Sequence, residues 1–242
     1  RAPLVRVDTD TEVLADAQRA EMPICADAGT FLQALADVLM PQSAAWDAAR
    51  IAQWRSAWRA EIEAERPGIV AVCDALRAAV PPETAIYSDM TQLAYVAKAV
   101  WDMPAPGLWH HPSGFGTLGY GTPAGFGGAV ARGADKPTMV IIGDYGFHYT
   151  MGVLGFAVEL WLPVPIVLWD NGKLKEIEES MVRSQIAPNA VVARNPDFLA
   201  LARAFGAQAV APGTLAEIGP ALVDAFAADG PTLVYLTPEV VG

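Results

Sequence analysis

Two short segments decide the fold of this chain: Gly143-Asp144-Tyr145-Gly146-Phe147 and, 27 positions later, Asp170-Asn171-Gly172-Lys173. Each follows a short apolar run, residues 138–142 and 165–169, and such runs indicate buried strands. The stretch between them, residues 151–160, has the pattern of a helix and is followed by prolines. A strand–helix–strand unit makes its two strands parallel neighbours, so both segments are expected at the carboxyl ends of the strands.

The side chains of Asp144 and Asn171 are expected to converge at that edge of the sheet. A carboxylate, an amide oxygen and one main-chain carbonyl form an all-oxygen group, which suits a small hard cation such as Mg²⁺. Each residue also has an ordinary explanation, because Asp often caps a helix and Asn-Gly is a common turn. The pair therefore carries more weight than either residue alone.

The remaining chain predicts an α/β fold with a parallel sheet and helices on both faces. From Gly68 onward, helical and strand patterns alternate, which is typical of that architecture. Residues 1–40 form a separate strand–helix–strand–helix pattern. Residues 41–66 predict a linker helix whose tryptophans share one face and which packs on the domain surface. We expect the α/β domain itself to span residues 67–242.

Composition narrows the classes of partner. A formal net charge of −11 argues against nucleic acid and anionic membranes. No run of 18 apolar residues exists, so no membrane span is expected. Cys25 and Cys73 fit no metal or redox spacing, so both are predicted to be reduced, buried and structural, as in a cytoplasmic protein.

The spacing of the two segments resembles the signature of enzymes that depend on thiamine diphosphate, in which G-D-G is followed by 24 to 27 residues and N-N. Here 24 residues separate Tyr145 from Asp170. Residues 114–124, GFGTLGYGTPA, are similar to the G-x-G-T-M-G-x-G-L-P-A segment of acetohydroxyacid synthases and related 2-oxo acid decarboxylases. Residues 231–236 are similar to the family's closing strand. The resemblance covers about residues 80–240.

The chain departs from the family pattern at two positions. Tyr145 stands where the third residue of G-D-G is usually Gly, and Asp170 replaces the first Asn of N-N. Because Tyr adopts positive φ poorly, we expect Gly146 to restore flexibility one position later. Asn171, which supplies the ligand in the family, is kept.

The resemblance implies a site for thiamine diphosphate and Mg²⁺. The metal ligands it implies are Asp144, Asn171 and the main-chain carbonyl of Lys173. Main-chain groups around the diphosphate would come from Gly143, Tyr145, Gly146 and Phe147, with Thr91 or Gln92 as a further contact. The Gly116 carbonyl and Leu118 would contact the pyrimidine, with the Leu118 side chain in the crook of the V-shaped cofactor. The alternative for Leu118 is an ordinary core position.

The resemblance also implies the substrate pocket. Glu176 and Ile177, the fifth and sixth residues after the metal Asn, would face the reacting carbon. A buried carboxylate is costly unless it is paired. Glu176 is therefore expected to meet a cation in the substrate, to transfer protons, or to point into solvent. His110 or His111 is a candidate proton relay, with a satisfied loop residue as the alternative.

Members of the family carry a pyrimidine-binding, a middle and a diphosphate-binding domain. By this order, residues 1–40 are the end of the middle domain and residues 67–242 are the whole diphosphate-binding domain. The chain is then a fragment without the activating glutamate, so we expect it to be inactive alone. We expect the whole protein to be a homodimer or homotetramer with its site between subunits.

The expected reaction is decarboxylation or carboligation of a small-molecule 2-oxo acid. Residues 88–92, 109–112 and 143–147 look like a subgroup that acts on 5-guanidino-2-oxopentanoate, and Glu176 with its acidic neighbours would suit its guanidinium. Two alternatives stay open: an acetolactate synthase large subunit, and a non-catalytic relative that only binds the cofactor. A Rossmann dinucleotide protein is disfavoured because the G-x-G-x-x-G loop is absent from the required place.

Overall fold

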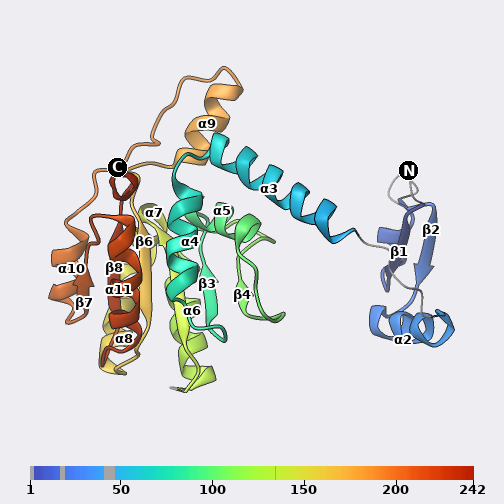
Figure 1. The fold of residues 1–242 in the computed structure, drawn as a ribbon, viewed down its shortest axis with the longest axis horizontal. Coiled ribbons are helices and arrows are strands. Elements are labelled where there is room, and N and C mark those ends of the chain that lie inside the picture. The colour runs from blue at the N-terminus through green and yellow to red at the C-terminus, as the bar shows by residue number, and fades with distance from the viewer. Residues whose placement is uncertain (1–2, 17–19, 41–46, 134) are drawn as a thin grey trace. The chain divides into compact units, whose positions relative to one another are not determined.

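The computed structural model describes residues 3–16, 20–40, 47–133 and 135–242. The chain divides into two compact units, Arg1–Ile51 and Ala52–Gly242, which are described separately (Figure 1). The division falls inside helix α3 (Ala48–Glu65). The domain boundaries expected from the sequence, at residues 40 and 66, stay predictions.

The first unit contains the strand–helix–strand–helix pattern expected for residues 1–40. Its elements are β1 (Val5–Asp8), α1 (Thr11–Leu14), β2 (Met22–Cys25) and α2 (Ala28–Val38), and the two strands pair in parallel. Neither helix buries a residue. The prediction for Cys25 was wrong, because so small a sheet leaves this free thiol exposed. Cys73, in the second unit, is free and buried as expected.

The second unit is built on a parallel sheet of six strands. They are β3 (Ala85–Ser88), β4 (Trp109–His110), β5 (Thr138–Gly143), β6 (Pro165–Trp169), β7 (Gln208–Val210) and β8 (Thr232–Leu236). Their order in the sheet is β4-β3-β5-β6-β8-β7, and each pair is parallel. The chain moves outward from β3 to β4 and then returns to place β5 on the other side of β3. The carboxyl ends of β3 and β5 therefore form a topological switch point, where such sheets bind ligands.

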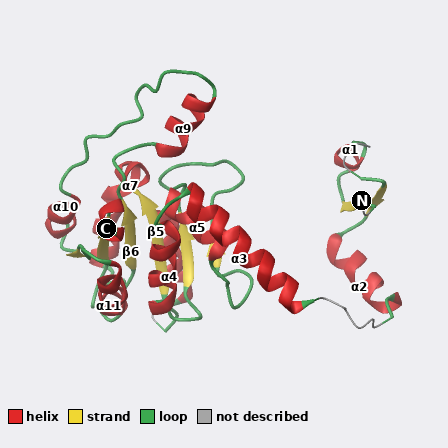
Figure 2. Cartoon of the chain, turned by 45° about the horizontal axis from the view of Figure 1, so that its top comes forward, coloured by secondary structure: helices red, strands yellow, loops and turns green. Residues whose placement is uncertain are grey.

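Helices cover both faces of this sheet (Figure 2). They are α4 (Ile69–Ala79), α5 (Gln92–Val100), α6 (Gly121–Arg132), α7 (Asp144–Thr150), α8 (Leu154–Glu159), α10 (Phe198–Ala204) and α11 (Leu215–Phe226). Helix α9 (Lys175–Arg183) lies instead beyond the ends of the strands (Figure 1). Two short 3₁₀ helices, η1 (Met151–Val153) and η2 (Pro238–Val241), complete the fold. The predicted α/β architecture is confirmed.

Alternating residues of β5 explain why both faces are covered. Met139 and Ile141 belong to a core with α4, α5 and α11, whereas Val140 and Ile142 belong to a second core with α6, α7, α8 and α10. All four side chains are fully buried. A strand buried on both faces has a continuous apolar sequence, which is the signal that predicted it.

Helix α6 lies close to the sheet because it carries glycines on its inner side. A Cβ atom at Gly125 would lie 2.3 Å from the Val140 side chain. That distance is impossible for a real contact, so this position requires glycine. The close packing fixes the glycine-rich segment that leads into α6.

The part of helix α3 that belongs to the second unit packs there through two arginines and an isoleucine. Arg59 pairs with Asp74 at 2.6 Å, Arg55 pairs with Asp102, and Ile62 packs on the core. Trp54 and Trp58 are exposed, and Trp46 lies outside the described residues. The helix thus packs on the domain surface as expected.

The helical segment between β5 and β6 begins earlier than expected. The sequence predicts a helix over residues 151–160, whereas α7 already begins at Asp144 and continues through η1 into α8. Glycines at 143 and 146 weaken the helical pattern of this turn in the sequence. In the part of the chain that the structure describes, no helix is both long and apolar enough to cross a membrane.

Candidate active site

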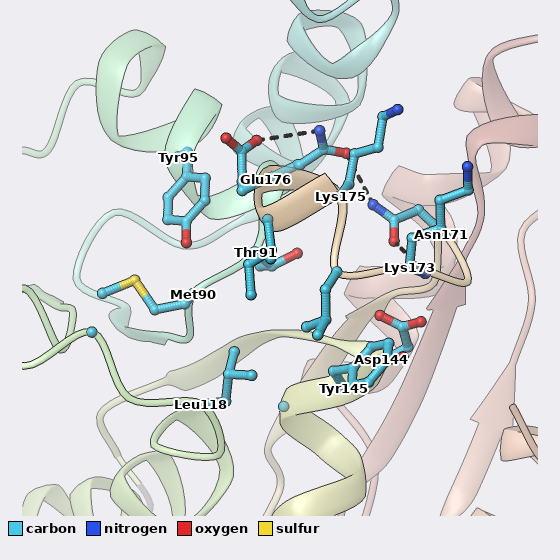
Figure 3. A pocket seen from close by; sticks show the side chains of 16 residues that line it. Met90, Thr91, Tyr95, Leu118, Asp144, Tyr145, Asn171, Lys173, Lys175 and Glu176 are labelled. Atoms are coloured by element: carbon cyan, nitrogen blue, oxygen red, sulfur yellow. Dashed lines mark hydrogen bonds between the residues drawn. The ribbon is translucent and has the colours of Figure 1, made fainter. Parts of the chain in front are cut away.

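A cavity of about 370 Å³ opens at the carboxyl ends of β3, β5 and β6 (Figure 3). Its wall is completed by the segment before α6 and by the first turn of α9. It is lined by Met90, Thr91, Gln92, Tyr95, Gly116, Leu118, Gly143, Asp144, Tyr145, Gly146, Asn171, Lys173, Leu174, Lys175, Glu176 and Ile177. The volume is in the range typical of small-ligand sites, and the position is the switch point between β3 and β5.

Most residues singled out from the sequence line this cavity, and three do not. His110 stacks on Tyr87, with ring centroids 4.5 Å apart. Phe147 is fully buried against Phe198, with ring centroids 5.7 Å apart. His111 lies behind Tyr95 and contacts the Ser88 hydroxyl through Nδ1 at 2.9 Å. Burial, and then the charge of Lys98, lowers the pKa of His111 to about 4, so its imidazole is neutral near pH 7.

Asp144 is the first residue of α7, and Gly143 is the cap of that helix. Its carboxylate is buried, and Oδ2 accepts a hydrogen bond from Asn195 Nδ2 at 2.8 Å. Burial raises the pKa of Asp144, although the Asn195 amide opposes this effect. The capping explanation for Asp144 therefore does not apply, and the carboxylate faces the cavity.

Asn171 lines the same cavity as Asp144, on the turn after β6 (Figure 3). Its Nδ2 donates to Gln92 Oε1 at 2.9 Å, and its Oδ1 accepts from the main-chain N–H of Lys173 at 3.1 Å. Gln92, at the start of α5, thus orients the Asn171 amide. The resemblance implied Thr91 or Gln92 as a contact of the diphosphate. It did not imply the hydrogen bond by which Gln92 orients Asn171.

Glu176 does not simply point into solvent. Arg66, just beyond α3, contacts it through Nη2 at 2.8 Å and contacts Glu179 through Nη1 at 2.6 Å. Gln92 Nε2 adds a bond to Glu176 Oε1 at 3.3 Å. Ile177, its neighbour, is 48% exposed. The chain therefore supplies its own guanidinium to the carboxylate that was expected to meet a cation of the substrate.

Helix α9 belongs to a long connection, residues 174–191, whose two ends meet; we call this segment the α9 excursion. Lys173 and Val192 form an antiparallel bridge, flanked by N–H···O bonds from Leu174 to Val191 at 2.8 Å and from Ala193 to Gly172 at 3.0 Å. The helix itself contains no buried residue. Its place over the strand ends, seen in Figure 1, therefore depends mainly on polar contacts.

Comparisons with known proteins agree with this geometry. Residues 89–236 match the model of the thiamine pyrophosphate enzyme family, C-terminal TPP-binding domain. The chain belongs to this family. The resemblance found in the sequence is thus confirmed.

The relatives include a probable 2-ketoarginine decarboxylase of Pseudomonas aeruginosa, 38% identical over 96% of this chain and 42% of that protein. An acetolactate synthase large subunit of Parasynechococcus marenigrum is 27% identical over 87% of this chain and 35% of that protein. The solved thiamine diphosphate-dependent 4-hydroxybenzoylformate decarboxylase of Rhodococcus jostii superposes with a TM-score of 0.74. It is 23% identical, and the match covers 98% of this chain and 44% of that one. The chain spans less than half the length of these relatives.

The residues of this TPP-binding domain fit the cofactor and its cation. One carboxylate and one amide oxygen, from Asp144 and Asn171, line the same cavity, and Lys173 joins them there. Among the described residues, no group of three or more His, Cys, Asp or Glu side chains is placed to hold a metal. An oxygen set with a single carboxylate leaves ligand positions for diphosphate oxygens, which suits Mg²⁺.

The departure from the family motif at Tyr145 has a simple structural explanation. Tyr145 lies in the first turn of α7 and has no positive φ, so tyrosine is tolerated without strain. Gly146 is not needed for flexibility, because its φ is not positive either. A Cβ at Gly146 would lie 2.9 Å from Asp89 Oδ2, so glycine is required there by close approach.

Asp89 is a residue of the site whose importance the sequence did not reveal. Its buried carboxylate accepts main-chain N–H bonds from Met90 at 2.7 Å, Gly119 at 2.7 Å and Gly121 at 3.2 Å. Burial raises its pKa, although these bonds oppose the shift. Asp89 thus fixes the segment that presents Leu118 to the cavity. The available signal was an acidic residue directly after a buried strand.

Proposed function

We propose that the whole protein is a thiamine-diphosphate- and Mg²⁺-dependent decarboxylase of 5-guanidino-2-oxopentanoate. The observation that carries the proposal is the 38% identity to a probable 2-ketoarginine decarboxylase along 96% of the chain. 2-Ketoarginine and 5-guanidino-2-oxopentanoate are the same compound. The matched stretch covers nearly the whole chain and so extends well beyond the residues proposed to hold the cofactor.

The proposed roles of the residues follow from the cavity. Thiamine diphosphate, when bound, supplies the electron sink that decarboxylation of a 2-oxo acid requires. Asp144, Asn171 and the Lys173 carbonyl would hold Mg²⁺ against the diphosphate. Main-chain groups from Gly143 to Gly146, with Thr91 and Gln92, would surround that end of the cofactor.

The other end of the cofactor would meet the segment fixed by Asp89. Leu118 is half-buried and lines the cavity between Gly116 and Gly119, whose φ angles are +71° and +85°. Such angles are accessible to glycine at little cost. This backbone would hold the Leu118 side chain where the V-shaped cofactor needs an apolar support.

Glu176 is proposed to bind the guanidinium of the substrate. Arg66 and Gln92 hold its carboxylate at the cavity wall, which fixes its position before a ligand arrives. A carboxylate has about four lone-pair sites, so it can accept from a second guanidinium as well. The substrate would then share Glu176 with Arg66, and Ile177 would contact the aliphatic part. His111, neutral and behind Tyr95, would act on the substrate only through other groups.

Acetolactate synthase is the second candidate, and the Arg66–Glu176 pair is the observation that favours it. A carboxylate already neutralised by the chain needs no cationic substrate, so pyruvate would also be accommodated. A non-catalytic relative is disfavoured because Asp144 and Asn171 line one cavity.

A panel of 2-oxo acids offered to the full-length protein tests the proposal. Pyruvate, 2-oxobutanoate, phenylpyruvate and 5-guanidino-2-oxopentanoate are compared by carbon dioxide release and by product analysis. The proposal predicts the highest kcat/KM for the guanidino acid. Accumulation of acetolactate from pyruvate with no preference for the guanidino acid supports the synthase instead. Cofactor binding without turnover of any of the acids supports the non-catalytic relative.

The assembly is part of the same proposal. We expect the full-length protein to be a cytoplasmic homodimer or homotetramer, because the activating glutamate of the family lies on another domain, across a subunit interface. Light scattering measures the oligomeric state. The 242 residues alone are expected to release no carbon dioxide, and release by this chain free of longer protein would contradict that expectation.

A further inference from the structure

Asn195 connects two buried carboxylates beside the cavity. It lies on the connection between α9 and α10 and is half-buried. Its Nδ2 donates to Asp144 Oδ2 at 2.8 Å and to Asp170 Oδ1 at 2.7 Å. Its Oδ1 lies 3.0 Å from His148 Nε2. An amide nitrogen has two hydrogens, and both are used here, one on each carboxylate.

The chemistry of the neighbours fixes the orientation of the Asn195 amide. An amide oxygen facing two carboxylates would be repelled, so the nitrogen must face them. The oxygen then faces His148, which must carry a proton on Nε2 to donate. Asn195 therefore has one orientation in which all its polar atoms are satisfied.

Asp170 is the reason why such a bridge is needed. It stands where the family motif has asparagine, and it is 9% exposed. Its other bonds come from the Gly172 main-chain N–H at 2.9 Å and the Tyr235 hydroxyl at 2.8 Å. Two buried carboxylates so close together repel each other unless donors lie between them. The Asn195 amide is the donor that both share.

We propose that Asn195 is a positioning residue for Asp144, which it holds in the orientation that presents the carboxylate to the metal. The inference rests on the proposed metal-binding role of Asp144. Groups that hydrogen-bond to metal ligands orient them, and their loss weakens metal binding. Asn195 also attaches the end of the α9 excursion to the metal ligand, so the wall that carries Glu176 is connected to the cation site.

The test titrates Mg²⁺ into the full-length protein saturated with thiamine diphosphate and measures the affinity by calorimetry. Asn195→Ala is expected to weaken Mg²⁺ binding about 10- to 100-fold. Asn189→Ala is the matched control, because Asn189 is an exposed asparagine of the same connection, and it is expected to bind Mg²⁺ as wild type does. Equal affinity of Asn195→Ala and Asn189→Ala would overturn the inference.

A double variant separates positioning from simple loss of structure. Asp170→Asn in the Asn195→Ala background removes the repelling carboxylate and restores the asparagine of the family motif. It is expected to recover at least part of the lost Mg²⁺ affinity, whereas a general structural defect would be made worse by a second substitution. Should Asn195→Ala fail to fold, the double variant is compared with Asp170→Asn alone. Failure of the double variant to fold, or a Mg²⁺ affinity at least 10-fold below that of Asp170→Asn, would count against the inference.

Asp144→Ala distinguishes this inference from the proposed function. If Asp144→Ala keeps its Mg²⁺ affinity, the metal assignment itself fails. If Asp144→Ala loses affinity while Asn195→Ala keeps it, the metal assignment stands and only the role of Asn195 fails.

Discussion

The strand ends that carry Asp144 and Asn171 and the helix that carries Glu176 face the same cavity, but different forces hold them. We refer to Asp89, Gly143–Gly146 and Asn171 as the strand-end wall, and to Leu174–Ile177 as the helix wall. Behind the first lie two apolar cores, one on each face of the sheet. The helix wall, by contrast, belongs to α9, a helix without a buried residue. Arg66 and Gln92 hold this helix by polar bonds.

This difference predicts which property a substitution in each wall will change. Apolar burial and close packing leave the strand-end wall little freedom, because each change there disturbs a core. Polar contacts at the helix wall can be exchanged at lower cost. We therefore expect substitutions in the strand-end wall to alter cofactor binding and stability, and substitutions in the helix wall to alter substrate preference.

The largest effect is expected for Asp144→Ala in the strand-end wall. The variant should bind thiamine diphosphate with Mg²⁺ about 2–5 kcal/mol more weakly, because the cation and diphosphate lose their carboxylate partner. Calorimetric titration of the full-length protein measures the loss. Glu176→Gln serves as the comparison from the helix wall and should bind the cofactor as wild type does. Equal weakening in both variants would remove the distinction between the walls.

Glu176→Gln should instead change substrate preference. Loss of a guanidinium–carboxylate bond is expected to cost about 1.5–3 kcal/mol. The preference for 5-guanidino-2-oxopentanoate over pyruvate, measured as the ratio of their kcat/KM values, should therefore fall roughly 10- to 150-fold. The matched control is Glu178→Gln, since Glu178 pairs with Lys173 and Lys175 and does not line the cavity. A ratio unchanged by Glu176→Gln would show that another group, with Glu179 the next to test, recognises the cation.

Gly146→Ala measures how tightly the strand-end wall is packed. The added Cβ would lie 2.9 Å from Asp89 Oδ2 and 3.1 Å from its Cγ, so the free energy of unfolding should fall by about 1–3 kcal/mol. Gly152→Ala is the control, because a Cβ there meets nothing within 4 Å. Urea unfolding of both variants gives the difference. Similar free energies of unfolding for the two variants would mean that the strand-end wall rearranges to accept the added methyl group.

The smallest effect is a difference in acid response. Burial raises the pKa of Asp89, so acid does not weaken the fold through this group. Bonds from Lys173 and Lys175 lower the pKa of Glu178, and Arg66 lowers that of Glu179 although burial opposes it. A carboxyl group whose pKa is lowered by folding stabilises the folded state at pH values above its ordinary pKa of about 4.3. This stabilisation is lost as the pH falls through the lower pKa of the folded state.

Hydrogen exchange checks this acid response. Amide protection in α9 should decrease as pH falls from about 5 to below 4, after correction for intrinsic exchange rates, while protection in β5 stays constant. Loss of protection in β5 before α9 would contradict the assignment of polar forces to the helix wall.

The sequence was sufficient for the fold and for most of the cavity because their signals are local. Apolar runs 138–142 and 165–169 became β5 and β6, and the motifs after them line the cavity. The remaining residues act through partners far along the chain. Asn195 lies 51 positions from Asp144, and Arg66 lies 110 positions from Glu176. No local pattern marks such residues, because their role depends on a tertiary contact.

The early start of α7 and the role of Gly146 were missed for a related reason. Helix propensity disfavours glycine, so residues 143–146 do not have a helical pattern. The tertiary contact that requires Gly146 is with Asp89, on a different strand end. Packing against a neighbour therefore outweighed the local preference.

The bridge between Lys173 and Val192 gives the helix wall a property of its own. Because the two ends of the excursion meet, residues 174–191 leave the sheet and return to it at nearly the same point. Lengthening a loop whose ends already meet costs little free energy, about 0.6 kcal/mol for each doubling. The segment is therefore a natural unit of exchange. We expect exchange of this segment between relatives at these two ends to change substrate preference while β6 and α10 stay in place.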